Sequence, residues 1–307
     1  MLESIASLLP KRIDRAFRRR SFEYFKQRRY DEYLARVDAN LEPLIIYQMG
    51  KVGSSTVVET LAKNCPEYAL YQVHVLTPEW VKEVENQYRQ ASKDLGKQTI
   101  DEHVLASRYL LDRMDRKQGR RRWKVISIVR DPVARNVSAF FQAFPIYFSS
   151  VAAEHDGKSI SSVKVEELIN LFLDQFGEDR HRLPLEWFQI HMLPAFGLDI
   201  YSSTFDRNKG YQIYSNEHCE LLILRTEDLR NTLRPALRDF LDVDIPALAS
   251  ANVSADKDYA ETYRAFIEQM VLPSDYLDTL YDSAYARYFY SKAEITGFRK
   301  RWEKSAS

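Results

Sequence analysis

The sequence predicts an α/β protein with a mainly parallel central sheet, arranged in three layers with added helices. Short apolar segments bounded by turn residues alternate with longer segments of helical spacing, which is typical of parallel sheets with crossover helices. Two of the apolar segments continue directly into the start of a helix, through a glycine-bearing loop and through a proline. The 307 residues, 45% of them hydrophobic, suffice for a sizeable core.

Residues 1–41 differ from the rest and are predicted to form a basic, helical N-terminal extension, with a main domain over 42–307. The first forty residues hold ten Lys or Arg against six Asp or Glu, a net charge of +4, with large apolar side chains between them. This pattern favours a helix packed on the main domain. The alternative is an amphipathic helix that contacts an anionic membrane surface peripherally.

The main domain is expected to alternate between strands and helices. Strands are predicted at 44–49, 68–76, 124–129, 199–204 and 219–225. Helices are predicted at 54–64, 78–93, 100–118, 132–144, 163–176, 184–196 and 228–242, and the tyrosine-rich tail 257–304 is expected to be mostly helical. The segment 149–162 is predicted to be a loop that could act as a lid.

The first strand ends in a loop suited to phosphate. Leu44-Ile-Ile-Tyr-Gln-Met-Gly-Lys-Val-Gly-Ser-Ser-Thr56 combines a buried strand, two glycines and a helix start, so backbone N–H groups, a lysine and hydroxyls converge. The candidate binding residues are Gly50, Lys51, Val52, Gly53, Ser54, Ser55 and Thr56. The Walker A pattern does not fit, because Lys51 precedes the second glycine. The alternative is an ordinary turn capped by Ser54 or Ser55.

A second strand, 123–129, ends in Arg130-Asp-Pro-Val-Ala-Arg-Asn-Val-Ser138. Pro132 suits the first turn of a helix, and Arg130 is placed at the carboxyl end of a strand, where open α/β sheets bind ligands. Arg130 and Ser138 could hold a second phosphate through a guanidinium and a hydroxyl. Arg135, which lies one helical turn after Arg130, could add to that site or face solvent. The alternative is a capped helix start with a surface ion pair.

These segments resemble the sulfotransferases that use 3′-phosphoadenosine-5′-phosphosulfate (PAPS). Lys51-Val-Gly-Ser-Ser-Thr56 resembles their 5′-phosphosulfate loop, and Arg130 to Ser138 their 3′-phosphate motif. Leu221-Leu-Ile-Leu-Arg-Thr-Glu-Asp-Leu229 is similar to a late strand of that superfamily, and 289–302 to its C-terminus. Tyr47 to Ser55 and 186–201 resemble bacterial capsular polysaccharide synthesis proteins. The resemblance spans about 42–304.

The resemblance implies a P-loop-like sulfotransferase fold, PAPS as co-substrate, its bisphosphate product PAP, and no metal. Lys51 would stabilise charge on the leaving 5′-phosphate, and the acceptor hydroxyl needs a general base. His74, in the region where this superfamily places its base, is the leading candidate; Glu186 and His191 are the alternatives. The segment Arg225 to Asp228 is expected to support the nucleotide site rather than react.

The acceptor is expected to be a saccharide or glycolipid hydroxyl. Gln48-Met49-Gly50 departs from the Pro-Lys-Ser-Gly-Thr-Thr loop of small-molecule sulfotransferases, which disfavours steroids and phenols. Two other functions stay open: an ATP-dependent phosphotransferase with an atypical loop, and a non-catalytic glycan- or partner-binding protein. The sequence predicts no oligomeric state.

Composition restricts location and partners. The formal net charge is zero, so nucleic acid is not an expected partner. Cys65 and Cys219 make no disulfide framework and are expected to be buried thiols. No apolar run is long enough to span a membrane, and no signal peptide is recognisable. The expected location is the cytoplasm, with a possible place for the extension on the inner face of the membrane.

Overall fold

The computed structural model describes residues 11–116, 122–154, 160–175, 177–246 and 259–303. Its centre is a five-stranded sheet of order β2-β1-β3-β5-β4. These strands are β1 (Glu42–Tyr47), β2 (Tyr68–Val73), β3 (Trp123–Val129), β4 (Tyr211–Ser215) and β5 (Cys219–Arg225). All neighbouring pairs are parallel except β4 with β5. The α/β class and the mainly parallel sheet are confirmed.

The register brings the strand ends to one edge of the sheet. Tyr47 pairs with Val73, and Val129 pairs with Arg225, so the carboxyl ends of β1 and β2, and those of β3 and β5, coincide. Because parallel strands share direction, the segments that follow all four strands emerge at this edge. Ligands of open α/β sheets bind at such an edge.

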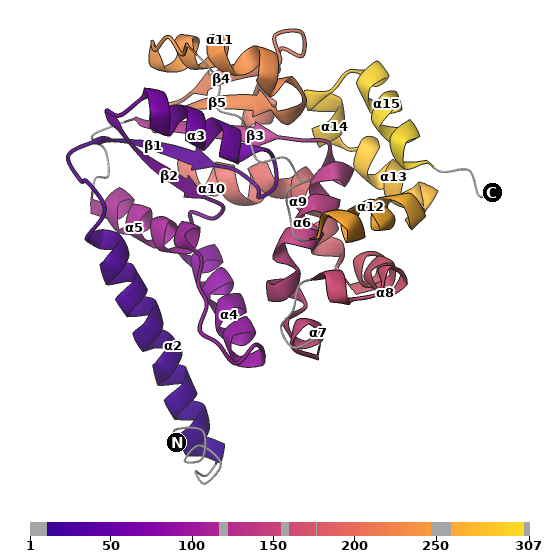
Figure 1. The fold of residues 1–307 in the computed structure, drawn as a ribbon. Coiled ribbons are helices and arrows are strands. Elements are labelled where there is room, and N and C mark those ends of the chain that lie inside the picture. The colour runs from indigo at the N-terminus through magenta and orange to yellow at the C-terminus, as the bar shows by residue number, and fades with distance from the viewer. Residues whose placement is uncertain (1–10, 117–121, 155–159, 176, 247–258, 304–307) are drawn as a thin grey trace.

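Helices cover both faces of the sheet. Figure 1 shows α3 (Ser54–Asn64) and α11 (Leu229–Leu241) above the sheet, and α5 (Glu102–Arg116) and α10 (Leu193–Phe196) below it. α11 turns a continuous apolar stripe toward the sheet, formed by Leu229, Leu233, Ala236, Leu237 and Phe240. The strand residues Leu44, Ile45 and Ile46 between these layers are fully buried.

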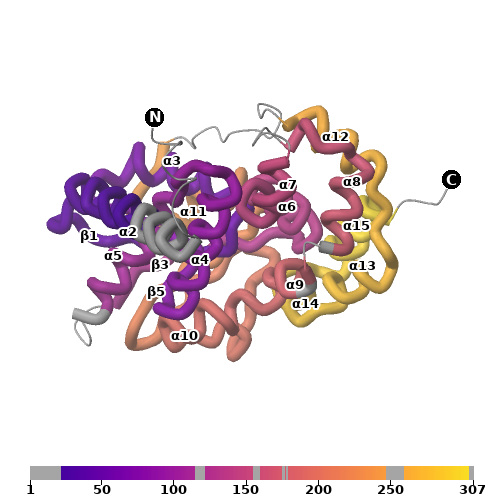
Figure 2. The backbone as a smooth tube through the Cα atoms, turned by 90° about the horizontal axis from the view of Figure 1, so that it is seen from below, coloured from indigo at the N-terminus to yellow at the C-terminus, as the bar shows by residue number. Residues whose placement is uncertain are grey.

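A second part of the core is aromatic and lies beside the sheet. Phe140 of α6 (Pro132–Tyr147) packs within 6 Å of Phe172 and Phe266, the latter from α12 (Ala260–Gln269). Figure 2 shows α12 and α8 (Val165–Asn170) beside α6 and α7 (Ser149–Glu154). The described part of the tail is helical as expected, in α12, α13 (Ser274–Tyr281), α14 (Ala284–Phe289) and α15 (Lys292–Trp302).

The strand predicted at 199–204 is wrong. Asp199 accepts a hydrogen bond from the backbone N–H of Tyr201, and the Ser202 hydroxyl donates to the Asp199 carbonyl, so the chain makes a 3₁₀ turn at Ile200–Ser202. Side chains that bond to nearby backbone compete with a sheet ladder. The fifth strand is instead β4, which forms a hairpin with β5; the Asn216 side chain accepts from two backbone N–H groups in the connection.

Two other segments differ from the prediction. The loop expected at 149–162 contains α7 and the 3₁₀ turn Ile160–Ser162, and residues 155–159 lie outside the described residues. The helix expected at 184–196 is interrupted by a π-helical turn, η3 (Phe188–Met192), between α9 (Glu178–Trp187) and α10. Pro194, at the start of α10, has no N–H to continue the regular ladder.

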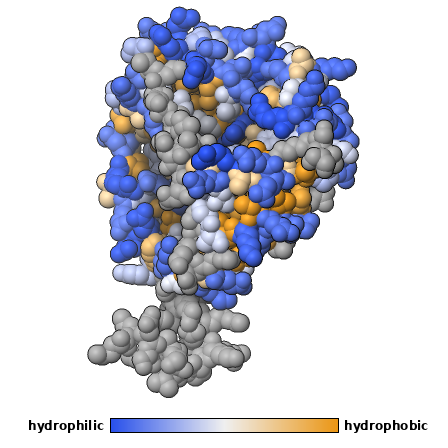
Figure 3. All heavy atoms as spheres, turned by 45° about the vertical axis from the view of Figure 1, so that its right-hand side comes forward, coloured by the Kyte–Doolittle hydropathy of each residue, from blue (hydrophilic) through white to orange (hydrophobic). Residues whose placement is uncertain are grey.

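The helix α2 (Lys11–Leu34) projects from the body toward the N-terminus in Figure 1. Its second half packs against α5 and α4 (Pro78–Asp94): Phe22, Tyr30 and Tyr33 are buried, and the Tyr30 hydroxyl donates to Asp112 at 3.0 Å. Among the described residues, no helix is both long and apolar enough to cross a membrane. In the view of Figure 3, most of the surface is hydrophilic, and apolar areas show between the hydrophilic ones.

Candidate functional site

The candidate site lies where four parallel strands end. β1 leads into the loop of residues 48–53, β2 into His74, β3 into Arg130, and β5 into Thr226. Hydrogen bonds join the segments that follow β1, β3 and β5 to one another, and His74 bonds to the first residue of the loop. The topology therefore brings the two sequence motifs that suggested phosphate binding to one place.

The loop after β1 has a strained backbone. Lys51 has φ 73° and Gly53 has φ 80°, and a non-glycine residue at positive φ costs of order 1 kcal/mol. Gly53 is the N-cap of α3, and no side chain caps this helix. The Ser54 hydroxyl instead accepts from Gln72 Nε2 at 3.0 Å. The alternative of a turn capped by Ser54 or Ser55 is therefore wrong, and the first-turn N–H groups are not used by a side-chain cap.

The closest neighbour of this loop is Thr226, after β5. Its hydroxyl oxygen lies 2.6 Å from the Val52 carbonyl oxygen and 2.9 Å from that of Val129. A Cβ on Gly53 would lie 3.3 Å from the Thr226 methyl carbon. The second glycine of the motif is thus required both by its positive φ and by this close approach.

Two arginines hold the loop from the other side. Arg130 Nη1 donates to the Lys51 carbonyl at 2.9 Å, and Arg135 Nε donates to the Gly50 carbonyl at 3.1 Å. Arg135 is only 4% exposed, and its Nη1 donates to the Asn136 side-chain oxygen at 3.2 Å. Burial lowers the pKa of Arg135, and the charge of Arg130 lowers it further. Within the described ranges neither guanidinium has a carboxylate partner.

The remaining predicted phosphate ligands lie around this centre. Lys51 Nζ donates to Gln142 Oε1 at 3.3 Å, across to α6. Ser138 of α6 is half-buried, and Ser55 and Thr56 of α3 are exposed and half-buried. No side-chain hydrogen bond of these three hydroxyls is found in the part of the chain that the structure describes. Val52 is fully buried, so it contributes backbone rather than a side chain.

His74 faces the loop in a defined tautomer. Its Nδ1 lies 2.8 Å from the Gln48 carbonyl, which can only accept, so Nδ1 carries the proton. Nε2 then has a free lone pair, and it would lie 3.7 Å from a Cβ on Gly50. Burial, and then the charge of His103, lower the pKa of His74 to about 3. The imidazole is therefore neutral at neutral pH.

Two further histidines lie near His74. The ring of His103, at the start of α5, is 4.5 Å from the His74 ring. Burial lowers the pKa of His103 to about 4. Burial and the charge of His74 lower that of His191, in η3, also to about 4. The sequence suggested His191 as an alternative base but gave no signal for His103, because the start of α5 and the end of β2 come together only in the folded chain.

Glu186, the third predicted catalytic residue, lies in α9. Its carboxylate pairs with Arg182 one helical turn earlier, at 2.8 Å, and both side chains are exposed by more than 40%. No contact within the described residues joins it to the loop or to His74. An exposed i,i+4 pair of this kind is worth only about 0.3–0.5 kcal/mol, so Glu186 is not fixed in place.

The segment after β3 is fixed from behind by the C-terminal helices. The buried carboxylate of Asp131 accepts from the Tyr281 hydroxyl at 2.9 Å and from Trp302 Nε1 at 3.3 Å. Its backbone N–H donates to Glu227 at 2.8 Å. The Tyr285 hydroxyl donates to the Arg130 carbonyl at 2.9 Å. Asp131 also caps α6, but the alternative of a surface ion pair is wrong, since it is buried.

Arg225 is a structural residue. It is 3% exposed, forms ion pairs with Asp228 and with Glu294 at 3.0 Å, and donates to the Phe289 carbonyl. Its charge is therefore compensated, in contrast to that of Arg135. This pairing ties the end of β5 to α14 and α15, consistent with the supporting role predicted for this segment.

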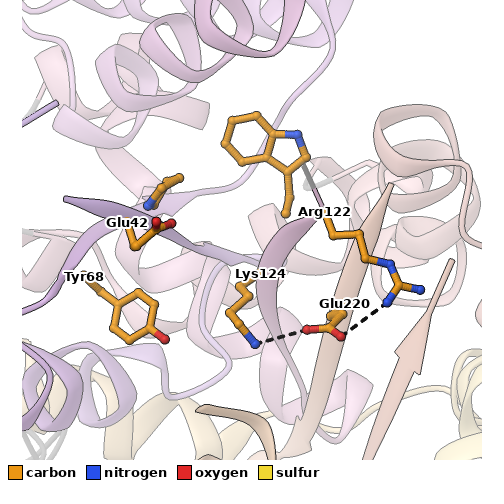
Figure 4. A pocket seen from close by; sticks show the side chains of 7 residues that line it. Glu42, Tyr68, Arg122, Lys124 and Glu220 are labelled. Carbon is orange, nitrogen blue, oxygen red and sulfur yellow. Dashed lines mark hydrogen bonds and ion pairs between the residues drawn. The ribbon is translucent and has the colours of Figure 1, made fainter. Parts of the chain in front are cut away.

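Figure 4 shows a hollow at the opposite edge of the sheet, where the strands begin. Lys124 and Arg122 both pair there with Glu220, at 3.1 and 3.5 Å. The charges of these three side chains satisfy one another, and the hollow shares none of the motif residues. Among the described residues, no group of His, Cys, Asp or Glu side chains is arranged to hold a metal ion.

A comparison with protein families finds a match in the second half of the chain. The model of the family "Putative capsular polysaccharide synthesis protein" matches residues 161–291. No curated protein and no solved structure matches the chain. The matched region includes η3, β4, β5 and Thr226, but not the loop after β1 or Arg130. The name of that family connects it with polysaccharide synthesis.

Proposed function

We propose that this chain is a PAPS-dependent sulfotransferase of P-loop-like fold that acts on a hydroxyl of a glycan or glycolipid. The observation that carries the proposal is the pair of guanidinium groups at the loop. Arg130 and Arg135 donate to consecutive carbonyls, those of Lys51 and Gly50, and neither has a carboxylate partner in the described part of the chain. The name of the matching family supports the glycan.

A buried guanidinium without a counter-charge is expensive. Burial of an unpaired ion costs several kcal/mol even after relaxation, and Arg135 is 4% exposed. An anionic group beside the loop would compensate both arginines. The first-turn N–H groups of α3, which no side chain caps, would add further donors. This residue set fits a ligand with more than one phosphate.

The two motifs divide that ligand between them. The loop and α3 would hold the 5′-phosphosulfate through Lys51, Ser55, Thr56 and backbone N–H groups. Arg130 and Ser138 would hold the 3′-phosphate through a guanidinium fork and a hydroxyl. The Ser138 hydroxyl is half-buried and uses no described partner, so it is available to donate. ATP lacks a 3′-phosphate, and binding that requires this group would therefore disfavour a phosphotransferase.

Bound PAPS supplies an activated sulfuryl group: an O–S bond forms to the acceptor, and the S–O bond to the 5′-phosphate breaks, with its electron pair leaving on PAP. His74 Nε2 takes the acceptor proton, because Nδ1 is occupied by the Gln48 carbonyl. Lys51 and the loop N–H groups stabilise the charge that develops on the leaving phosphate. The low pKa of His74 in the ligand-free protein, about 3, keeps this lone pair free at neutral pH.

The test is calorimetric titration with PAP, with 5′-AMP and with ATP plus Mg²⁺, repeated on Arg130→Ala. The matched control is Arg122→Ala, an arginine at the other edge of the sheet that pairs with Glu220. We expect PAP to bind tightest and Arg130→Ala, but not the control, to weaken it at least tenfold. Equal binding of 5′-AMP, or tighter binding of ATP, would overturn the proposal and favour a phosphotransferase or a glycan-binding protein.

A further inference from the structure

An exposed tryptophan stands beside the histidine cluster. Of the four tryptophans, Trp187 and Trp302 are buried and Trp123 is half-buried, whereas Trp80 is 38% exposed. It lies in the first turn of α4, which begins at Pro78 directly after the segment that carries His74. Trp80 is therefore at the same edge of the sheet as the candidate base.

The inner side of Trp80 rests on His191. The two rings are 4.9 Å apart at 58°, and Trp187 lies behind His191 with ring centroids 5.7 Å apart. His191 is 3% exposed and belongs to η3, and single π-helical turns of this kind are frequent at functional sites. Its Nδ1 is buried and has no hydrogen-bond partner within the described ranges. The indole is thus held on one side and open on the other.

Trp80 also lies near the candidate base along the chain. His74 follows β2 and is separated from Trp80 only by residues 75–79, which lead into α4. Gln48, whose carbonyl holds His74, has a fully buried side-chain amide, and neither its Oε1 nor its Nε2 finds a partner in the part of the chain described. Gln48 and His191, which contact His74 and Trp80 respectively, thus both carry buried, neutral polar atoms without a described hydrogen-bond partner.

The charges around Trp80 restrict the ligand further. On α4 its nearest charged neighbours are Glu79, Lys82 and Glu83, all exposed, with two negative charges against one positive. The three histidines are neutral. An open aromatic face beside neutral imidazoles suits a ring that has both C–H faces and hydroxyl edges. A polyanionic chain would meet excess negative charge there.

We propose that Trp80 is the stacking platform of an acceptor subsite that takes an uncharged sugar ring, with His191 beneath the indole. The placement of a hydroxyl of that ring at His74 rests on the proposed function; the stacking on Trp80 does not. Trp80 thereby selects the class of saccharide and contributes binding rather than chemistry.

The test is fluorine NMR of the full chain labelled with 5-fluorotryptophan, in which Trp80→Phe assigns the Trp80 signal. The probes are neutral hexose and N-acetylhexosamine oligosaccharides at millimolar concentration, and polygalacturonate oligosaccharides as the acidic series. We expect the neutral series to shift the Trp80 signal and leave the Trp123 and Trp302 signals unchanged. Trp80→Ala should weaken the binding about tenfold, about the size of an aromatic contact. Tyr24→Ala, which removes an exposed aromatic on α2, should not.

Two results would overturn the subsite: no shift of Trp80 with any member of either series, or a shift with the acidic series alone. Titration of PAP into the same samples separates this from the proposed function. If PAP binds but no oligosaccharide shifts the Trp80 signal, the proposed nucleotide site is supported and the subsite is refuted. If an oligosaccharide shifts the Trp80 signal but PAP does not bind, Trp80 belongs to a sugar-binding surface and the sulfotransferase proposal is refuted. Unchanged PAP binding by Trp80→Ala would show that the variant is folded.

Discussion

The neutral histidine cluster should make stability fall on mild acidification. The folded-state pKa values of His74, His103 and His191 are lowered to about 3, 4 and 4, from 6.5. Because the unfolded chain binds protons near 6.5 and the folded chain does not, stability is fully present above that pH and falls as the pH decreases toward 4. Each histidine contributes at most about 1.4 kcal/mol per pH unit, where the unfolded imidazole is protonated and the folded one is not, so the three together contribute at most about 4 kcal/mol per pH unit.

Other groups oppose this slope. Burial raises the pKa of Asp131 and of Glu227, so the folded state takes up protons there before the unfolded state does. The difference between the wild type and His103→Asn isolates one histidine, since the carboxylates are common to both. Urea unfolding at pH 7, 6 and 5 should show a slope about 1 kcal/mol per pH unit smaller in the variant, because the unfolded imidazole is only partly protonated in the upper half of this range.

His218→Asn is the control for this measurement, because His218 is exposed by 61% in the hairpin between β4 and β5. It should leave the slope unchanged. Histidine NMR signals give the second readout: the imidazole of His103 should titrate well below its ordinary value of 6.5. Equal slopes for the wild type and His103→Asn, or titration of His103 near 6.5, would refute the burial of a neutral cluster.

Three further predictions concern the loop. Arg135→Met should lower PAP affinity by about 10- to 100-fold. It should change the free energy of unfolding without ligand by less than about 2 kcal/mol, because the substitution removes a buried unpaired charge. Calorimetry measures the affinity and urea unfolding the stability; a large loss of stability with unchanged affinity would contradict the prediction. Gly53→Ala should cost about 1 kcal/mol more than Gly96→Ala, because both have positive φ but only Gly53 faces Thr226. Thr226→Val should destabilise by about 1–3 kcal/mol, because it removes the one hydroxyl proton that the Val52 and Val129 carbonyls share, and Thr226→Ser should restore most of this loss. Thermal unfolding measures both pairs of variants, and equal values within either pair would contradict the prediction.

The sequence was sufficient to predict those parts of the structure that depend on one short, contiguous segment. A strand, a glycine-bearing loop and a helix follow one another within thirteen residues at 44–56, and the structure has all three in that order. The segment from Trp123 through Arg130 to Ser138 was predictable for the same reason, with Pro132 and Asp131 marking the helix start. The strand wrongly predicted at 199–204 shows where such local signals fail. There the hydrogen bonds of Asp199 and Ser202 stabilise a turn, although the apolar pattern predicts a strand.

The parts that depend on meetings between distant segments were not predictable. The burial of Arg135 and its bond to Gly50 depend on how α6 lies against the loop, and the contact of the His103 ring with His74 depends on how α5 packs against β2. The bond from Trp302 to Asp131 spans most of the chain. None of these contacts has a periodicity or a motif, so only the folded chain reveals them.

The two motifs that we propose bind phosphate form one structure rather than two adjacent ones. The carbonyls of Gly50 and Lys51 accept from Arg135 and Arg130, so the negative ends of the loop dipoles are turned toward the guanidinium groups. The positive φ at Lys51 allows this, and successive N–H groups in such a turn form a concave anion site. The strain of the loop is thus maintained by the second motif, and the second motif is in turn fixed by Asp131 and its partners from the C-terminal helices. A substitution in α13 or α15 that removes a partner of Asp131 should therefore alter the loop through Arg130, although the substituted residue does not contact the loop.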